Sequence, residues 1–194
     1  MKKVSTYLFL ILFSYSATSF ADDISDFQIE GISIGDSLLD YMSENEILKE
    51  FELGKDDYHW TDKKFANVYL YRASELYEYM SATVKKNDKK YIIHGLRGMI
   101  DYQNINKCFK KQTEIVDELS TIFKNTEKTK EEFKNSADST GQSIVYANYF
   151  ILSSGDEVEV TCYTFSEHVN SPDGLDVGLA TKEFVNWLVK FAKY

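Results

Sequence analysis

Apolar and polar residues alternate with a period of two over several stretches of the chain, as is typical of β-strands. The clearest pair is Ser143–Leu152 and Glu157–Phe165, joined through a Ser-Ser-Gly-Asp turn. A short strand is expected over 27–34, and three more over 65–72, 77–86 and 91–100. Because neighbouring strands are joined by turns too short for a crossover helix, we expect a mainly antiparallel sheet.

A period between three and four predicts helices elsewhere. From 106 to 123 the apolar residues fall on one face, and Asn104 can cap the start of this helix. Ser43 and Glu46 form a capping box for an earlier helix, and Thr181 can cap a last one. The pattern therefore predicts one α+β domain, with a mainly antiparallel sheet and helices on one face.

Two polar stretches are interpreted as loops. Residues 124–142 are rich in charge and end in Ser-Thr-Gly, which predicts a fraying helix end and a mobile loop. Residues 169–179 contain the only proline, Pro172, and several Gly and Asp residues. Neither stretch is expected to contribute a strand.

The first 21 residues are typical of a signal peptide. Lys2 and Lys3 precede an apolar run from Val4 to Phe13, and Ser19-Phe20-Ala21 offers small residues for cleavage before Asp22. We therefore expect residues 22–194 to form a single domain that is exported to the periplasm or outside the cell. No membrane span is expected after cleavage, because no later stretch is long and apolar enough.

Export makes the two cysteines informative. Cys108 lies on the apolar side of the predicted helix 106–123, and Cys162 lies on the side of its strand that also carries Val158 and Val160. Two cysteines in an oxidising compartment usually pair, so we expect a Cys108–Cys162 disulfide. It would fasten the central helix to the sheet.

The chain is acidic. Its formal charge is −9, and loss of Lys2 and Lys3, the only charged residues in 1–21, would bring it to −11. Such a surface repels phosphate backbones, so we expect no nucleic-acid partner. It would tolerate a cationic partner, including a cationic enzyme of the cell envelope that the protein would inhibit.

Gly35-Asp36-Ser37-Leu38 resembles the first block of the GDSL family of esterases and lipases. The resemblance implies Ser37 as a nucleophile, which would need a histidine and an acid. That family places Asp-x-x-His near its C-terminus, whereas here Phe165 lies three residues before the last histidine, His168. Asp36 as a helix N-cap after a glycine turn explains the same residues, and the hydrolase is kept as the alternative.

The three histidines, His59, His94 and His168, lie far apart with no ligand spacing, so we expect no metal and no cofactor. His94 lies within an apolar strand and is interpreted as a packed or hydrogen-bonded residue. Four tyrosines crowd two neighbouring strands, and aromatic side chains on an open sheet face can bind a sugar or a partner chain. This possible binding face consists of Tyr69, Tyr71, Tyr77 and Tyr79.

The opening Ile34-Gly35-Asp36-Ser37-Leu38-Leu39-Asp40-Tyr41, with the later cysteine pair, resembles an uncharacterised family of small secreted bacterial proteins. That resemblance implies no activity and no site residues. The strand, Gly-containing turn and short helix also resemble small modules of outer-membrane assembly lipoproteins and β-lactamase-inhibitor-like proteins, which implies protein binding. The sequence thus favours a non-catalytic exported module for an envelope protein or glycan, and it leaves the ligand and oligomeric state open.

Overall fold

The computed structural model describes residues 23–54, 63–71, 74, 76–124, 126–136, 138–169 and 171–191 of the 194-residue chain. The expected signal peptide, residues 1–21, lies outside the described residues, as does His59. The helices are η1 Ile24–Asp26, η2 Leu38–Asp40, α1 Glu44–Leu53, α2 Ile105–Ile122 and α3 Lys182–Phe191. The strands are β1 Gln28–Ile29, β2 Ile32–Ser33, β3 Phe65–Tyr69, β4 Tyr79–Lys85, β5 Ile93–Tyr102, β6 Glu127–Lys134, β7 Ile144–Ile151, β8 Glu157–Thr164 and β9 Asp173–Ala180.

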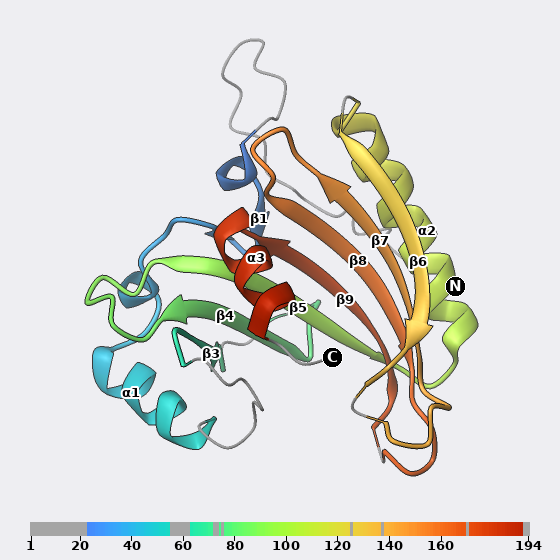
Figure 1. Cartoon of the computed structure of the whole chain (residues 1–194), viewed down its shortest axis with the longest axis horizontal. Helices are drawn as coiled ribbons and strands as arrows, with labels where there is room; N and C mark the ends of the chain where they lie inside the picture. Colours follow the sequence, from blue (N-terminus) through green and yellow to red (C-terminus); the bar gives the residue numbers. More distant parts are fainter. Residues whose placement is uncertain are drawn as a thin grey trace, which may run out of the picture.

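Seven of the strands form one antiparallel sheet in the order β3-β4-β5-β9-β8-β7-β6 (Figure 1). Strands β3, β4 and β5 form one meander, and β6, β7 and β8 form a second, with α2 connecting them along the chain. The last strand, β9, pairs with β5 on one side and β8 on the other, so it joins the two meanders. The predicted α+β class and antiparallel sheet are confirmed.

The core lies between the sheet, α2 and the N-terminal segment. Helix α2 buries its apolar side, and the rings of Phe27 and Phe123 pack with centroids 4.7 Å apart. Gln112 on α2 donates through Nε2 to the carbonyl oxygens of Tyr146 and Val160, at 2.6 and 2.9 Å. These bonds satisfy a buried amide group and tie the helix to β7 and β8.

The expected disulfide is present. Cys108 of α2 and Cys162 of β8 are bonded, with their Cα atoms 6.1 Å apart, and both residues are fully buried. The predicted caps are also confirmed: the side chain of Asn104 accepts from the Asn106 amide, and that of Thr181 accepts from the Phe184 amide. The capping box of α1 is formed by Ser43 and Glu46.

Two stretches interpreted as loops each contain a strand, so the expectation that neither contributes one was wrong. Strand β6 lies within 124–142, and its charged side chains, nearly all exposed, gave no apolar alternation because it is an edge strand. Strand β9 covers most of 169–179 and lies in the middle of the sheet. Its apolar residues do alternate, as Leu175, Val177 and Leu179 all face the core.

The N-terminal segment also differs from the prediction. The single strand over 27–34 is two short strands, because Glu30 and Gly31 turn the chain with positive φ angles of 53° and 76°. Ser37, not Asp36, caps the short helix that follows. The Asp36 carboxylate instead accepts from the Ser33 amide at 2.8 Å and from the Tyr41 hydroxyl at 2.5 Å.

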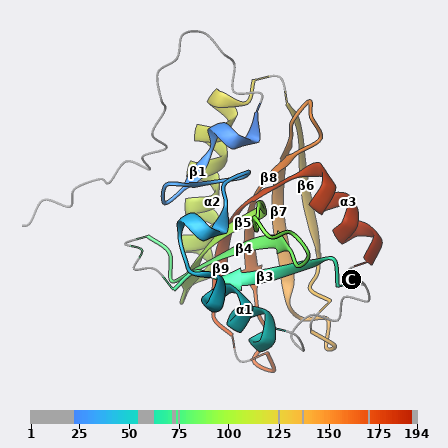
Figure 2. The ribbon, with the colours of Figure 1, turned by 90° about the vertical axis from the view of Figure 1, so that its left-hand side faces the viewer.

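Helix α3 lies on the other face of the sheet from α2, so the helices do not all share one face (Figures 1 and 2). It docks where Gly95 leaves room, because a Cβ atom at Gly95 would lie 2.9 Å from the Phe184 ring. Phe184 and Trp187 also pack on Phe65, with ring centroids 5.2 and 5.1 Å apart. Among the described residues, α2 and the N-terminal segment therefore pack on one face of the sheet, and α3 packs on one end of the other face (Figures 1 and 2).

Reduction of the disulfide is expected to destabilise the protein. The bridge joins residues 54 apart in sequence, and on the chain-entropy model a loop of that size contributes about 4 kcal/mol. Thermal unfolding followed by circular dichroism, with and without reductant, should show a clearly lower Tm in the reduced sample. The Cys108→Ala/Cys162→Ala variant should match the reduced protein and not respond to reductant. An unchanged Tm would contradict the stabilising role of the bridge between α2 and the sheet.

Candidate functional site

The face of the sheet opposite α2, here called the open face, carries most of the polar side chains of the central strands. The strand register places one row across all seven strands: Tyr69, Ser81, Arg97, Gly178, Glu159, Tyr149 and Thr129. A neighbouring row contains Tyr79, Met99, Asp176, Thr161, Ala147 and Glu131. The two rows bring residues from all seven strands onto one continuous surface.

Gly178 allows two of these side chains to meet across a strand. Arg97 on β5 and Glu159 on β8 flank Gly178 of β9 in the same row. Adjacent strands lie about 4.8 Å apart, so β5 and β8 are roughly 10 Å from each other. A Cβ atom at Gly178 would lie 2.7 Å from Cγ of Glu159, which shows that the Glu159 side chain crosses over this glycine. It forms an ion pair with the Arg97 guanidinium.

Asp176 completes this ion-pair network. Its Oδ2 atom lies 3.1 Å from Nη1 of Arg97, so one guanidinium contacts two carboxylates. The side chains of Asp176 and Glu159 are only 10% and 16% exposed. Burial of carboxylates is costly unless they are paired, and Arg97 offsets that cost for these two.

The open face holds more carboxylates than its arginine neutralises. Burial and the nearby charges of Glu159 and Glu131 together raise the pKa of Glu157 to about 7, against the opposing effect of Arg97. Burial also raises the pKa of Asp176 to about 6, although Arg97 opposes this shift. Perturbed carboxyl groups gathered on one surface are typical of functional sites.

A buried hydroxyl lies in the same surface. Thr161 is 1% exposed, and its register position is directly opposite Asp176. Within the described residues its Oγ1 atom has no hydrogen-bond partner. Buried polar atoms are nearly always hydrogen-bonded, so this atom indicates unused bonding capacity in the floor of the open face.

The predicted tyrosine face is divided by the fold. Tyr69 and Tyr79 belong to the open face, and Tyr71 lies beside Tyr69 with ring centroids 6.4 Å apart. All three are exposed, Tyr71 most of all at 79%. Tyr77 is buried in the core, where its ring fills the space beside Gly98, so including it in an exposed face was wrong.

Ser37 has structural hydrogen bonds. Its hydroxyl donates to the carbonyl oxygen of Lys90 at 2.7 Å and accepts from the Leu39 amide at 3.3 Å. Both partners are backbone groups: the bond to Lys90 joins the start of η2 to the segment before β5, and the bond from Leu39 caps η2. The geometry gives Ser37 the role of a helix cap.

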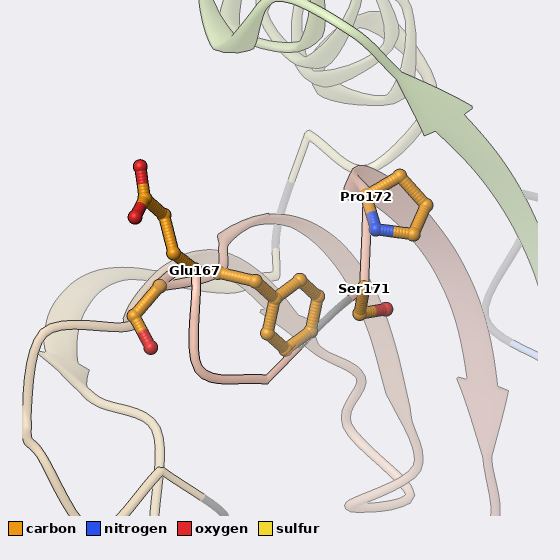
Figure 3. A pocket seen from close by; sticks show the side chains of 5 residues that line it. Glu167, Ser171 and Pro172 are labelled. Carbon is orange, nitrogen blue, oxygen red and sulfur yellow. The ribbon is translucent and has the colours of Figure 1, made fainter.

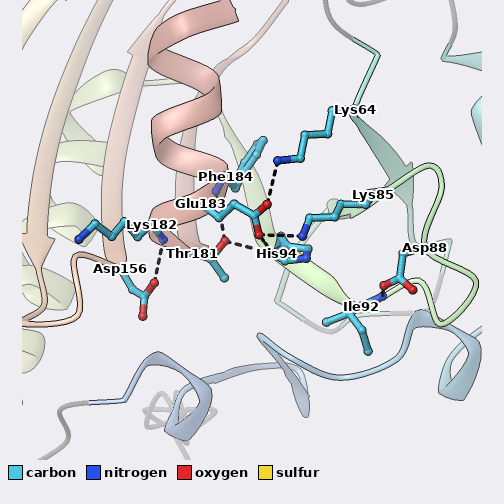
Figure 4. Close-up of polar contacts among 10 residues, drawn as sticks. All are labelled: Lys64, Lys85, Asp88, Ile92, His94, Asp156, Thr181, Lys182, Glu183 and Phe184. Atoms are coloured by element: carbon cyan, nitrogen blue, oxygen red, sulfur yellow. Dashed lines mark hydrogen bonds and ion pairs between the residues drawn. The ribbon is translucent and has the colours of Figure 1, made fainter.

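His94 lies under the start of α3. Figure 4 shows two lysines reaching Glu183 there: Lys64, the residue before β3, and Lys85, the last residue of β4. The two ammonium groups lie 2.8 and 2.7 Å from the Glu183 carboxylate, and they lower the pKa of Glu183 to about 2. His94 Nδ1 lies 3.3 Å from Oγ1 of Thr181 and 3.9 Å from Glu183. One ring nitrogen makes both contacts, so the ring is not placed to relay a proton between them. This cluster holds α3 on the sheet.

The remaining features of the described residues do not form a second candidate site. A hollow in the β8–β9 connection is lined by Phe165, Ser166, Glu167, Ser171 and Pro172, but Figure 3 shows Glu167 pointing away from Ser171 and Pro172. In the part of the chain that the structure describes, no three His, Cys, Asp or Glu side chains converge on a metal position. None of the described helices is long and apolar enough to cross a membrane.

Sequence reasoning missed Arg97, Glu159 and Asp176 as site residues. Each comes from a different strand, and only the register brings them together. One available signal was the alternation Gly174, Asp176, Gly178 against Leu175, Val177, Leu179, which marks β9 as a strand with a small, polar second face.

Comparison with known proteins finds no matching family model, no matching curated protein and no matching solved structure. The function is therefore argued from the geometry of the open face.

Neutralising Glu157 is expected to stabilise the protein at alkaline pH. The folded state holds the proton of Glu157 more tightly than the unfolded state, so this group favours folding below about pH 4.5 and the advantage is lost as the pH rises through 7. Glu157→Gln should raise the free energy of unfolding at pH 8 by roughly 1–3 kcal/mol and change it little at pH 4.

Urea unfolding at both pH values measures this difference. The matched control is Glu132→Gln, because Glu132 is exposed and lies on the other face of β6. An equal change in the free energy of unfolding of the two variants at pH 8 would contradict the account of a crowded acidic surface.

Proposed function

We propose that this protein is an exported, non-catalytic binding module and that its open face binds a protein partner. The observation that carries the proposal is a surface that combines buried, crowded carboxylates with exposed tyrosines, and on which α3 packs at one end (Figure 1). The buried disulfide agrees with export, since such bonds persist in oxidising compartments. The expected signal peptide points in the same direction.

The size of the open face suits a protein partner better than a small ligand. Seven strands at about 4.8 Å spacing span nearly 30 Å, which is the scale of a standard protein interface. Tyrosine and arginine are enriched in such interfaces, and both lie in the central row as Tyr69 and Arg97. The hollow lined by Pro172 is separate and holds none of these groups.

Side-chain contacts fix a helix on each face of the sheet. A disulfide and two hydrogen bonds from Gln112 fix α2 on the opposite face, and α3 is held by Glu183 and its two lysines. A surface that does not rearrange on binding loses less conformational entropy, which favours affinity. The fold therefore supports recognition by a preformed surface.

Site-specific photo-crosslinking tests the proposal. A photoreactive residue at Tyr79, which is 53% exposed on the open face, is expected to capture a defined protein in cells that export the chain. The matched control carries the same residue at Lys110, which is exposed on α2 on the opposite side of the sheet. Capture from position 110 alone, or only of glycan from position 79, would contradict the proposal.

A further inference from the structure

Tyr149 on β7 is surrounded by carboxylates of three different residues. Glu159 is directly opposite Tyr149 in the register, and Glu157 is two residues from Glu159 on the same face of β8. On the other side, Glu131 of β6 is diagonal to Tyr149, because Thr129 is its direct partner. Opposed and diagonal side chains in a sheet lie within about 5–8 Å of each other. The four residues thus form one cluster on the open face, here called the Tyr149 cluster.

The charges around this cluster do not balance. Burial raises the pKa of the Tyr149 hydroxyl most, the charges of Glu159, Glu157 and Glu131 raise it as well, and Arg97 is the cation that opposes them. The same Arg97 is already shared between Glu159 and Asp176. Glu157 experiences the same surroundings, with Glu159 and Glu131 against Arg97. An additional positive charge at this position would relieve the repulsion among the carboxylates.

A second, independent feature points to a missing partner. The unpartnered Thr161 hydroxyl lies on the same face of β8, two residues after Glu159, beneath the side chains of the open face. Its Oγ1 atom can accept a hydrogen bond from a donor group that reaches the floor of the open face. The carboxylates do not converge as metal ligands among the described residues, so an organic cation fits the arrangement better than a metal ion.

We propose that the Tyr149 cluster receives a lysine or arginine side chain from a basic segment of the partner protein, an inference that rests on the function proposed above. The aromatic face attracts a cation through its quadrupole, and the carboxylates around it supply charge-assisted hydrogen bonds. The overall charge of −9 favours approach of a basic partner as well.

A labelled decalysine peptide, with decaglutamate as the negative probe, tests this inference on the purified full-length protein with its disulfide intact. The amide signals of Tyr149 and Glu159 should shift on titration in a nitrogen-15 NMR spectrum. Glu131→Gln/Glu157→Gln should weaken decalysine binding about tenfold, which corresponds to about 1.4 kcal/mol. Asp117→Asn/Glu118→Gln changes the net charge equally on exposed positions of α2 and should weaken it less than about twofold.

Two further measurements separate a specific site from general charge attraction. Tyr149→Leu should weaken decalysine binding about threefold by removing the ring contact. Binding should be tighter at pH 8 than at pH 6, because Glu157, with its pKa raised to about 7, carries its full charge only at the higher pH. The charges facing Glu157 from the neighbouring strands are Glu131, Glu159 and Arg97.

Equal weakening by the two double variants, or no shift at Tyr149 and Glu159, would overturn the inference. If Glu131→Gln/Glu157→Gln still gives the full crosslink from position 79, the binding function stands and the basic side chain at the Tyr149 cluster is rejected. If position 79 gives no protein crosslink in the unmodified background, the proposed function itself fails. If only the Glu131→Gln/Glu157→Gln variant loses both decalysine binding and the crosslink from position 79, with its fold unchanged by circular dichroism, the binding function and the basic side chain at the Tyr149 cluster are both supported.

Discussion

The chemistry of the open face depends on the missing side chain at Gly178. Strand β9 joins the two meanders, and any larger residue at this position would meet Glu159. Because the glycine leaves that space, Glu159 reaches Arg97 two strands away, and Arg97 then also contacts Asp176. One backbone position in the central strand thus allows three charged residues from three strands to form a network on an otherwise open surface.

Two further glycines leave space for packing, one on the core face of the sheet and one on the open face. Gly98 faces the core and accommodates Tyr77, whereas Gly95 faces the open side and accommodates Phe184 of α3. The first helps close the buried face, where the Cys108–Cys162 bridge fixes α2. Gly95 places α3 at one end of the open face. Stability and recognition therefore lie mainly on opposite faces of the same sheet, so that changes to one need not disturb the other.

Features set by local sequence were predictable, and those set by register were not. The hairpin β7–β8, helix α2 and the cysteine pair follow from periodicity and composition over short stretches. Strand β9 was missed because glycine and aspartate, which usually mark turns, occupy its open face for packing reasons. Tyr77 and Tyr79 are two residues apart, which would place them on the same face of a strand. Only Tyr79 is within β4, however, and Tyr77 turns into the core.

The central claim is that Arg97 and Glu159 interact across Gly178. A double-mutant cycle with Arg97→Met and Glu159→Gln, measured by urea unfolding at pH 7, tests it most directly. The account predicts a favourable coupling free energy of about 1–3 kcal/mol in the natural background, and near zero when Gly178→Ala forces Glu159 aside. A coupling near zero with Gly178 in place would contradict the network and, with it, the arrangement of the open face.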